Sequence, residues 1–340
     1  MRKVSAGMKK EKTISLAVVL IVFTLWIAPL SVEGAEYPNR PITIVSPASP
    51  GGLFDTVGRP FALLAEKHLG QPLAVVNKPG ATMMLGGKVV ADAAPDGYTL
   101  LLGASAMACA LEWEIAEGRK PPFTLLGDFV PIGSFVLTPP LVIVPYDSPW
   151  KTLNDLIRDT KAKPGGYAFC SGGLYGNTHV PVELLLRAIG TKARHVPYQG
   201  GGPCLSSVVG KHVDFGSQFP GSTIPLMRGK KLRVLAVQGN KRLQSIPDIP
   251  TVKELGVDAV FYNWLGLLAP KKTPAPIVAK LREVTAKVAR EKPFIDAIEG
   301  QGDEVHTMTG DELAKHWARE SETIARIYEQ IKKEEKSSGK

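Results

Sequence analysis

Short apolar segments alternate with amphipathic segments along most of this 340-residue chain. The apolar segments have the length of buried strands, and the segments between them repeat their apolar residues at helical spacing. This alternation favours an α/β fold with mostly parallel sheets. Strands are predicted at 42–46, 73–76, 99–103, 141–145, 167–171, 213–217 and 233–238, and helices at 58–69, 84–93, 152–162, 178–189, 203–210, 275–290 and 311–334.

Residues 1–34 have the pattern of a secretory signal peptide and are not counted as fold. A basic start is followed by the apolar stretch 14–28, by Pro29 and by small residues near Gly34. A retained membrane anchor is the alternative, because the apolar stretch approaches the length of a span. Cleavage is favoured by Pro29 and the small residues, so we expect a mature protein in the periplasm or outside the cell.

The composition of the mature chain narrows its class. Without residues 1–34 the formal charge falls from +9 to about +6, which favours an anionic small ligand or simply aids solubility. The Lys and Arg residues are scattered without interleaved aromatics, so a nucleic-acid partner is not expected. About three hundred residues suit two domains.

The cysteines and histidines give no metal or cofactor signal. Cys109, Cys170 and Cys204 have no CxxC spacing, and one disulfide between an undetermined pair is compatible with an oxidising compartment. Six histidines show no zinc-binding spacing. We therefore predict no metal site and no cofactor.

The first predicted ligand loop follows the strand at 42–46. It is rich in Pro and Gly and opens a helix, an arrangement that offers free backbone N–H groups to an anion. Asp55 is interpreted as a helix cap rather than as an acid. The predicted ligand contacts here are Ala48, Ser49, Gly51, Gly52 and Leu53.

A second loop, 171–179, also leaves a strand and opens a helix, and is the predicted counterpart of the first. An alternative function is a hydrolase or transferase with Ser171 as nucleophile and His179 as base, although the Ser lacks a GxSxG elbow. We predict no catalytic residue. The predicted ligand contacts here are Ser171, Tyr175, Asn177, Thr178 and His179.

Three further places complete the predicted site. The loop after the strand at 99–103 lies at a carboxyl strand end, where α/β folds place ligands. A glycine-rich segment at 198–202 lacks P-loop or dinucleotide spacing and is interpreted as a flexible rim. The third place follows the strand at 213–217. The predicted contacts are Ala104, Ser105, Tyr198, Gln218 and Phe219.

Several motifs, in order, resemble the tripartite tricarboxylate transporter receptors, the TctC or Bug family. They include a Pro-Gly-Gly-x-x-Asp loop ending at Asp55, an Asn-Lys-Pro-Gly-Ala turn starting at Asn77, a Pro-Asp-Gly-Tyr-Thr-Leu motif ending at Leu100, a Ser-Gly-Gly loop ending at His179 and a Pro-Tyr-Gln-Gly-Gly-Gly segment ending at Gly202. The resemblance covers essentially the whole mature chain.

The resemblance implies a two-lobed periplasmic-binding-protein clamshell of type II-like architecture, with two α/β domains joined by two crossovers. Domain 1 would take 36–138 with 262–340, and domain 2 would take 139–261. A monomer would bind a di- or tricarboxylate or an aromatic acid between its lobes and deliver it to the membrane permease subunits of a tripartite transporter. A signalling role instead of uptake stays open.

The chain departs from the family pattern at three places. Gln218 stands where an acidic residue is common, and Thr82 and Met83 stand where a glycine pair is usual. Pro60 requires either a kink or a helix that begins near Gly58.

Overall fold

The computed structural model describes residues 37–50, 53–198, 200–300 and 303–337. The predicted signal peptide, Gly51 and Gly52 lie outside these ranges. From Arg40 onward the chain forms one compact unit, which is described below. Among the described residues, no helix combines the length and hydrophobicity that crossing a bilayer requires.

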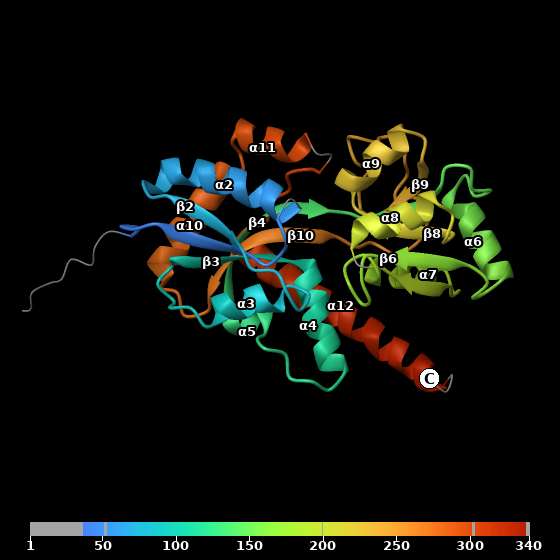
Figure 1. Cartoon of the computed structure of the whole chain (residues 1–340), viewed down its shortest axis with the longest axis horizontal. Coiled ribbons are helices and arrows are strands. Elements are labelled where there is room, and N and C mark those ends of the chain that lie inside the picture. The colour runs from blue at the N-terminus through green and yellow to red at the C-terminus, as the bar shows by residue number, and fades with distance from the viewer. Residues whose placement is uncertain (1–36, 51–52, 199, 301–302, 338–340) are drawn as a thin grey trace, which may run out of the picture. The chain divides into compact units, whose positions relative to one another are not determined.

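The first sheet has five strands in the order β2-β1-β3-β10-β4 (Figure 1). β1 pairs in parallel with β2 and β3, while β10 runs antiparallel between β3 and β4. All residues of β10 and most of β3 and β4 are buried, as expected for strands covered on both faces. The bounds are β1 Ile42–Ser46, β2 Leu73–Asn77, β3 Thr99–Ala104, β4 Phe129–Thr138 and β10 Asn263–Pro270.

Helices cover both faces of the first sheet. α2 contacts both α10 and α11 on one face, while α3, α4, α5 and α12 lie on the other (Figure 1). The second group encloses an aromatic core that includes Trp264, Trp317 and Tyr328. The bounds are α2 Leu53–Leu69, α3 Met84–Ala91, α4 Ser105–Ala116, α5 Leu125–Asp128, α10 Ala275–Val288, α11 Lys292–Glu299 and α12 Gly310–Ser337.

The second sheet also has five strands, in the order β7-β6-β8-β5-β9. β6 pairs in parallel with β7 and β8, and β5 is the antiparallel member. One core cluster joins this sheet to α6 and α7, and another joins it to α8 and α9. The bounds are β5 Leu141–Pro145, β6 Ala168–Ser171, β7 Arg194–Pro197, β8 Phe215–Gln218, β9 Leu232–Val237, α6 Leu153–Ala162, α7 Val180–Ala188, α8 Gly201–Val209 and α9 Pro220–Arg228.

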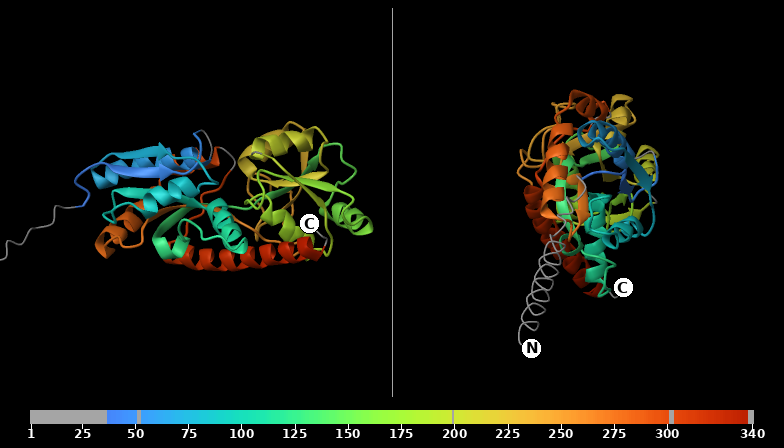
Figure 2. Two further views of the ribbon diagram at one scale, coloured as in Figure 1. Left: turned by 60° about the horizontal axis from the view of Figure 1, so that its bottom comes forward. Right: turned by 90° about the vertical axis from the view of Figure 1, so that its left-hand side faces the viewer.

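The chain passes between the sheets twice. Pro139 and Pro140 join β4 to β5, and the segment 238–262 joins β9 to β10. α12 runs beneath helices of both sheets, in contact with α4, β4 and α7 (Figure 2). The two sheets are therefore linked by two chain crossings and by one long helix.

The prediction of an α/β fold with mostly parallel sheets is confirmed, because each sheet has four parallel strands and one antiparallel strand. A helix start near Gly58 is wrong: α2 begins at Leu53 and contains Pro60. The single helix predicted at 275–290 ends at Val288, and α11 follows it. Seven elements of the described residues were not predicted from the sequence, namely α4, α5, β4, β7, α9, β10 and α11.

Candidate functional site

The carboxyl ends of the parallel strands face one another across the two chain crossings. In the first sheet β1, β3 and β4 end at Ser46, Ala104 and Thr138, and β10 begins at the same edge because it is antiparallel. A direct contact joins this edge to the loop after β6, since Asn177 Nδ2 donates to Asn263 Oδ1 at 3.0 Å. Ligands of α/β folds bind at such strand ends.

Several helices begin at these edges without a side-chain cap. No N-cap side chain accepts a hydrogen bond from the first turn of its helix in α4, α7, α8 or α9, whose N-cap residues are Ala104, His179, Gly200 and Phe219. First-turn N–H groups and the positive end of the helix dipole favour an anion at such positions.

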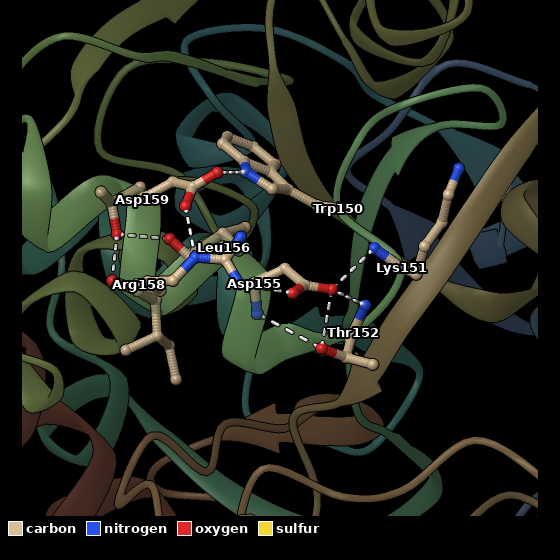
Figure 3. Close-up of polar contacts among 9 residues, drawn as sticks. Trp150, Lys151, Thr152, Asp155, Leu156, Arg158 and Asp159 are labelled. Atoms are coloured by element: carbon tan, nitrogen blue, oxygen red, sulfur yellow. Dashed lines mark hydrogen bonds and ion pairs between the residues drawn. The ribbon is translucent and has the colours of Figure 1, made fainter.

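The N-terminus of α6, on the other edge of the second sheet, shows the contrast. Thr152 Oγ1 accepts from the backbone N–H of Asp155 at 3.2 Å, and Asp155 Oδ2 accepts from the N–H of Thr152 at 3.0 Å (Figure 3). Trp150 Nε1 donates to Asp159 at 2.9 Å, which fixes the approach to the helix. This capping box is a structural helix start. α3, α5, α10 and α11 also begin without a side-chain cap, so a missing cap does not by itself mark a ligand edge.

Asn77, at the end of β2, organises the first loop. Its Nδ2 group lies within 3.2 Å of Ser46 Oγ, 3.1 Å of Ala48 O and 3.0 Å of Asp55 Oδ1. The sequence suggested only a turn residue here. The parallel register, which pairs Ser46 with Asn77, is what brings this amide to the loop.

Asp55 lies at the third residue of α2, in its first turn, and is buried. It accepts from Asn77, and Arg59 NH2 lies 3.4 Å from the same oxygen. The carboxylate thus fastens the helix start to the end of β2. Of the predicted contacts in this loop, Ser49 is exposed, Ala48 and Leu53 are half-buried, and Gly51 and Gly52 lie outside the described residues.

Ser171 is engaged within its own loop. Its hydroxyl donates to Gly173 O at 2.6 Å, and the same oxygen lies 2.8 Å from His195 Nε2. A hydroxyl has one hydrogen and a carbonyl only accepts, so His195 Nε2–H is the donor to Ser171. A histidine that acts as a base for Ser171 would instead have to accept the hydrogen bond from the Ser171 hydroxyl.

His179, the base of the alternative enzyme function, does not contact Ser171. Its Nδ1 accepts from the N–H of Tyr175 at 2.9 Å, and its ring stacks on His195 at 3.7 Å between centroids. Thr178 Oγ1 accepts from Gly172 N at 2.8 Å. The predicted contacts Thr178 and His179 therefore shape this loop, and the proposed nucleophile–base pair is absent from the geometry.

Burial controls the charge of His195. Burial, and next the neighbouring His179, lower the pKa of His195 to about 3. The imidazole is neutral at pH 7, in agreement with a stacked ring that donates to a hydroxyl.

Gln218 has a free polar atom at the edge of the second sheet. The side chain is 2% exposed, and among the described residues its Nε2 has no hydrogen-bond partner. A Cβ added at Gly201 would lie 2.8 Å from Gln218 Oε1, and one at Gly172 would lie 2.9 Å from Gly201 N. Glycine at both positions therefore lets three backbone segments converge on this amide.

Of the remaining predicted contacts, two lie at the edge of the first sheet and two beside the second sheet. Ala104 is buried, and Ser105 Oγ donates to Tyr262 O at 3.2 Å and accepts from Trp264 N at 3.1 Å. Ser105 thus fastens α4 to the second chain crossing. Tyr198 and Phe219 are half-buried beside the second sheet.

Tyr175 connects the second loop to helices of the first sheet. Its ring stacks on Trp113 of α4 at 3.4 Å between centroids, and its carbonyl accepts from Tyr328 OH at 2.6 Å. The residue adopts a left-handed backbone with φ 55°. A sequence offers no signal for such a contact across 153 positions.

One disulfide joins Cys170 at the end of β6 to Cys204 in α8. Both residues are buried, and Cys109 is free and buried. The sequence allowed one disulfide without choosing the pair. The bond holds the start of α8 against the strand that leads into the second loop.

Most of the chain is similar to proteins of one known family. A family described as tripartite tricarboxylate transporter family receptor, TctC, matches residues 57–333. Protein BugT of Bordetella pertussis is 32% identical over 301 residues, covering 86% of this chain and 90% of that protein. A UPF0065 protein from the gbd 5' region of Cupriavidus necator is 34% identical over 264 residues, covering 76% and 77%.

Solved structures have the same fold. A TctC solute-binding protein from Polaromonas without ligand has 30% identity and a TM-score of 0.76, covering 86% of this chain and 99% of that one. MatC from Rhodopseudomonas palustris with bound malate has 27% identity and a TM-score of 0.72, covering 86% and 100%. The R. palustris protein Rpa4515 with adipate has 25% identity and a TM-score of 0.74, covering 86% and 98%.

Two linked α/β sheets with helix starts at facing edges define a solute-binding protein of the periplasmic type. The chain belongs to the tripartite tricarboxylate transporter receptor family, as its motifs predicted. That family consists of receptors that bind solutes and is not a family of enzymes.

Proposed function

We propose that this receptor captures a small organic dicarboxylate between the facing edges of its two sheets. The observation that carries the proposal is the unpartnered, buried Nε2 of Gln218 at an edge where α7, α8 and α9 begin without side-chain caps. Amide N–H groups in a water-poor setting bind a carboxylate through charge-assisted hydrogen bonds. Two similar proteins, solved with malate and with adipate, support the ligand class.

The proposed contacts follow from what is free and what is engaged. We assign direct ligand contact to Ser49, Tyr198, Gln218 and Phe219, together with the backbone of the first loop. Asn177 is included because its Nδ2 has a second N–H beside the one that it donates to Asn263. Ser105, Ser171 and Thr178 act through the shape of their loops, because their hydroxyls make the structural bonds described above. His179 does so through Nδ1, while its Nε2 lies 3.5 Å from Glu183 Oε1 and makes no hydrogen bond among the described residues. Water bridges between ligand and loop N–H groups are compatible with this arrangement.

The proposal includes closure of two lobes. Domain 1 is assigned to 36–138 with 262–340 and domain 2 to 139–261, so that each lobe has one sheet as its core. Closing the lobes would replace the hydration shell of the carboxylates with N–H donors from both edges.

The proposed location and partners rest on the family and on the chemistry of the chain. Residues 1–34 would be removed on secretion, and a buried disulfide suits an oxidising compartment. The loaded receptor, as a monomer, would deliver its ligand to membrane permease subunits.

The test is a thermal-shift and calorimetric screen of the mature protein against malate, succinate, adipate and citrate, with glycine as an uncharged-side-chain control. We expect saturable 1:1 binding of a dicarboxylate, with the ligand recovered chemically unchanged. If no member of the panel raises the melting temperature, the ligand class is wrong. If the bound acid is converted to a product, the receptor assignment is wrong.

A further inference from the structure

A cavity of about 910 Å³ lies beside α12, and Ser105, which donates to Tyr262 O, is next to its wall. Its walls come from α12, from the segment 253–262 that leads into β10, and from Leu137 near the end of β4. None of the residues that we assign to the dicarboxylate site lines it. We call this cavity the α12 pocket.

The inner walls of the α12 pocket are apolar. Val257, Phe261 and Ile324 are buried, and Val260 and Leu137 are half-buried. The volume lies in the range of small-molecule sites, whose walls are mostly apolar with a few polar groups. A flat or short apolar group therefore suits the interior.

Two buried polar atoms at the pocket have no partner among the described residues. Glu320 is 8% exposed; its Oε2 accepts from Trp264 Nε1 at 2.7 Å, whereas its Oε1 is unpartnered. His316 Nε2 is likewise buried and unpartnered. A buried polar atom left without a hydrogen bond costs about 1–3 kcal/mol, so a ligand group that satisfies it is favoured.

The rim of the pocket has both signs of charge. Lys253 and Arg319 are exposed cations, and Asp258 is an exposed anion. Arg319 lies close enough to His316 to lower the pKa of that imidazole further, after the larger effect of burial. One carboxylate is attracted by Arg319 and Lys253, while a second would meet Asp258.

We propose that the α12 pocket is a second ligand site, for a small monocarboxylic acid with an apolar ring and a hydroxyl at its far end. The carboxylate pairs with Arg319 at the rim. The ring lies against Val260 and Phe261, and the hydroxyl donates to Glu320 Oε1. This selectivity for one carboxylate distinguishes the pocket from the dicarboxylate site between the sheets.

The test uses 4-hydroxybenzoate as the probe, titrated calorimetrically into the mature protein, with benzoate as its partner lacking the hydroxyl. We expect 4-hydroxybenzoate to bind at one site and benzoate about tenfold more weakly, since benzoate leaves Glu320 Oε1 unpartnered. Arg319→Gln should weaken 4-hydroxybenzoate about tenfold through loss of the charged pair. Val260→Trp should abolish binding, because the indole takes the place proposed for the ring of the probe.

Two controls separate this site from the proposed dicarboxylate site. Arg228→Gln removes an exposed arginine of α9 outside the pocket and should leave 4-hydroxybenzoate binding unchanged. Gln218→Glu should also leave it unchanged. The proposal is overturned if 4-hydroxybenzoate does not bind, if Val260→Trp binds it as wild type does, or if Gln218→Glu abolishes its binding. None of these results depends on whether a dicarboxylate binds between the sheets.

Discussion

At the scale of single residues, Gln218 is the group that most distinguishes this receptor. It is buried, its Nε2 donor is unpartnered among the described residues, and the family resemblance places an acidic residue at the same position. An amide attracts a carboxylate, whereas an acidic side chain would repel it or select an amino group instead. The residue therefore favours an acid without a positive group at this point of the ligand.

Replacing Gln218 with Glu should weaken dicarboxylate binding by roughly 10- to 100-fold, because a like charge then faces the ligand in a poorly solvated place. Calorimetric titration measures the effect. Gln244→Glu is the matched control, since it adds the same charge at an exposed position. Equal affinities for the two variants would show that Gln218 does not contact the ligand.

His195 links stability to pH. In the unfolded chain the imidazole takes up a proton near pH 6.5, while in the folded chain burial and His179 lower its pKa to about 3. The unfolded state therefore binds more protons between these values, and the free energy of unfolding falls as the pH falls. The expected loss from this residue is about 2 kcal/mol between pH 6.5 and pH 5.

Denaturant unfolding at several pH values tests this contribution. The His195→Gln variant should lose less stability than the wild type between pH 6.5 and pH 5, whereas His212→Gln, at an exposed position, should follow the wild type. Parallel curves for wild type and His195→Gln would contradict the assigned cause. The comparison between variants is required because burial raises the pKa of Asp303 to about 6 and of Glu320 to about 7, and these carboxyls favour the folded state at low pH.

At the scale of elements, α12 fastens the second loop to helices of the first sheet. Tyr328 OH lies 2.6 Å from Tyr175 O and 3.2 Å from Cys109 O, and its ring is fully buried. The ring of Trp113 in α4 stacks on the ring of Tyr175. The loop that opens α7 is thus held by side chains from α4 and α12.

Replacing Tyr328 with Phe keeps the ring and removes the hydroxyl. Buried carbonyls then lose their donor, so the free energy of unfolding should fall by about 1–2 kcal/mol. Tyr146→Phe, at a position 40% exposed, should change it by less than about 0.5 kcal/mol. A Tyr328→Phe variant as stable as the wild type would show that the hydroxyl makes no net contribution.

The sequence predicted the elements whose apolar residues follow a clear helix or strand pattern, and missed the elements without such a pattern. The strand at 42–46 and the strand at 141–145 coincide with β1 and β5, because each is a short apolar run bounded by turn residues. β4 contains Pro131 and Gly133, and β10 contains Gly266. Pro and Gly are typical of turns, so no strand was predicted at either place.

The candidate site was predictable only in part, because its connections are tertiary. The sequence indicated the loops after β1 and β6, since each follows an apolar strand with small residues and a helix start. It did not indicate that His195 contacts Ser171 or that Asn77 contacts Ser46, because both pairs depend on the register of parallel strands. The disulfide partner of Cys170 was undetermined for the same reason.

At the scale of the whole molecule, two sheets joined by two crossings and by α12 form the framework for the proposed closure of the receptor on its ligand. The proposed contacts come from both edges, so each lobe alone holds only part of the site. Binding that requires both edges should bring the lobes together and reduce the dimensions of the protein.

Small-angle X-ray scattering of the mature protein, with and without a saturating dicarboxylate, tests this account most directly. We predict a smaller radius of gyration with the ligand than without it. Glycine at the same concentration should leave the scattering curve unchanged. A dicarboxylate that saturates the protein by calorimetry and yet leaves the radius of gyration unchanged would contradict capture by lobe closure.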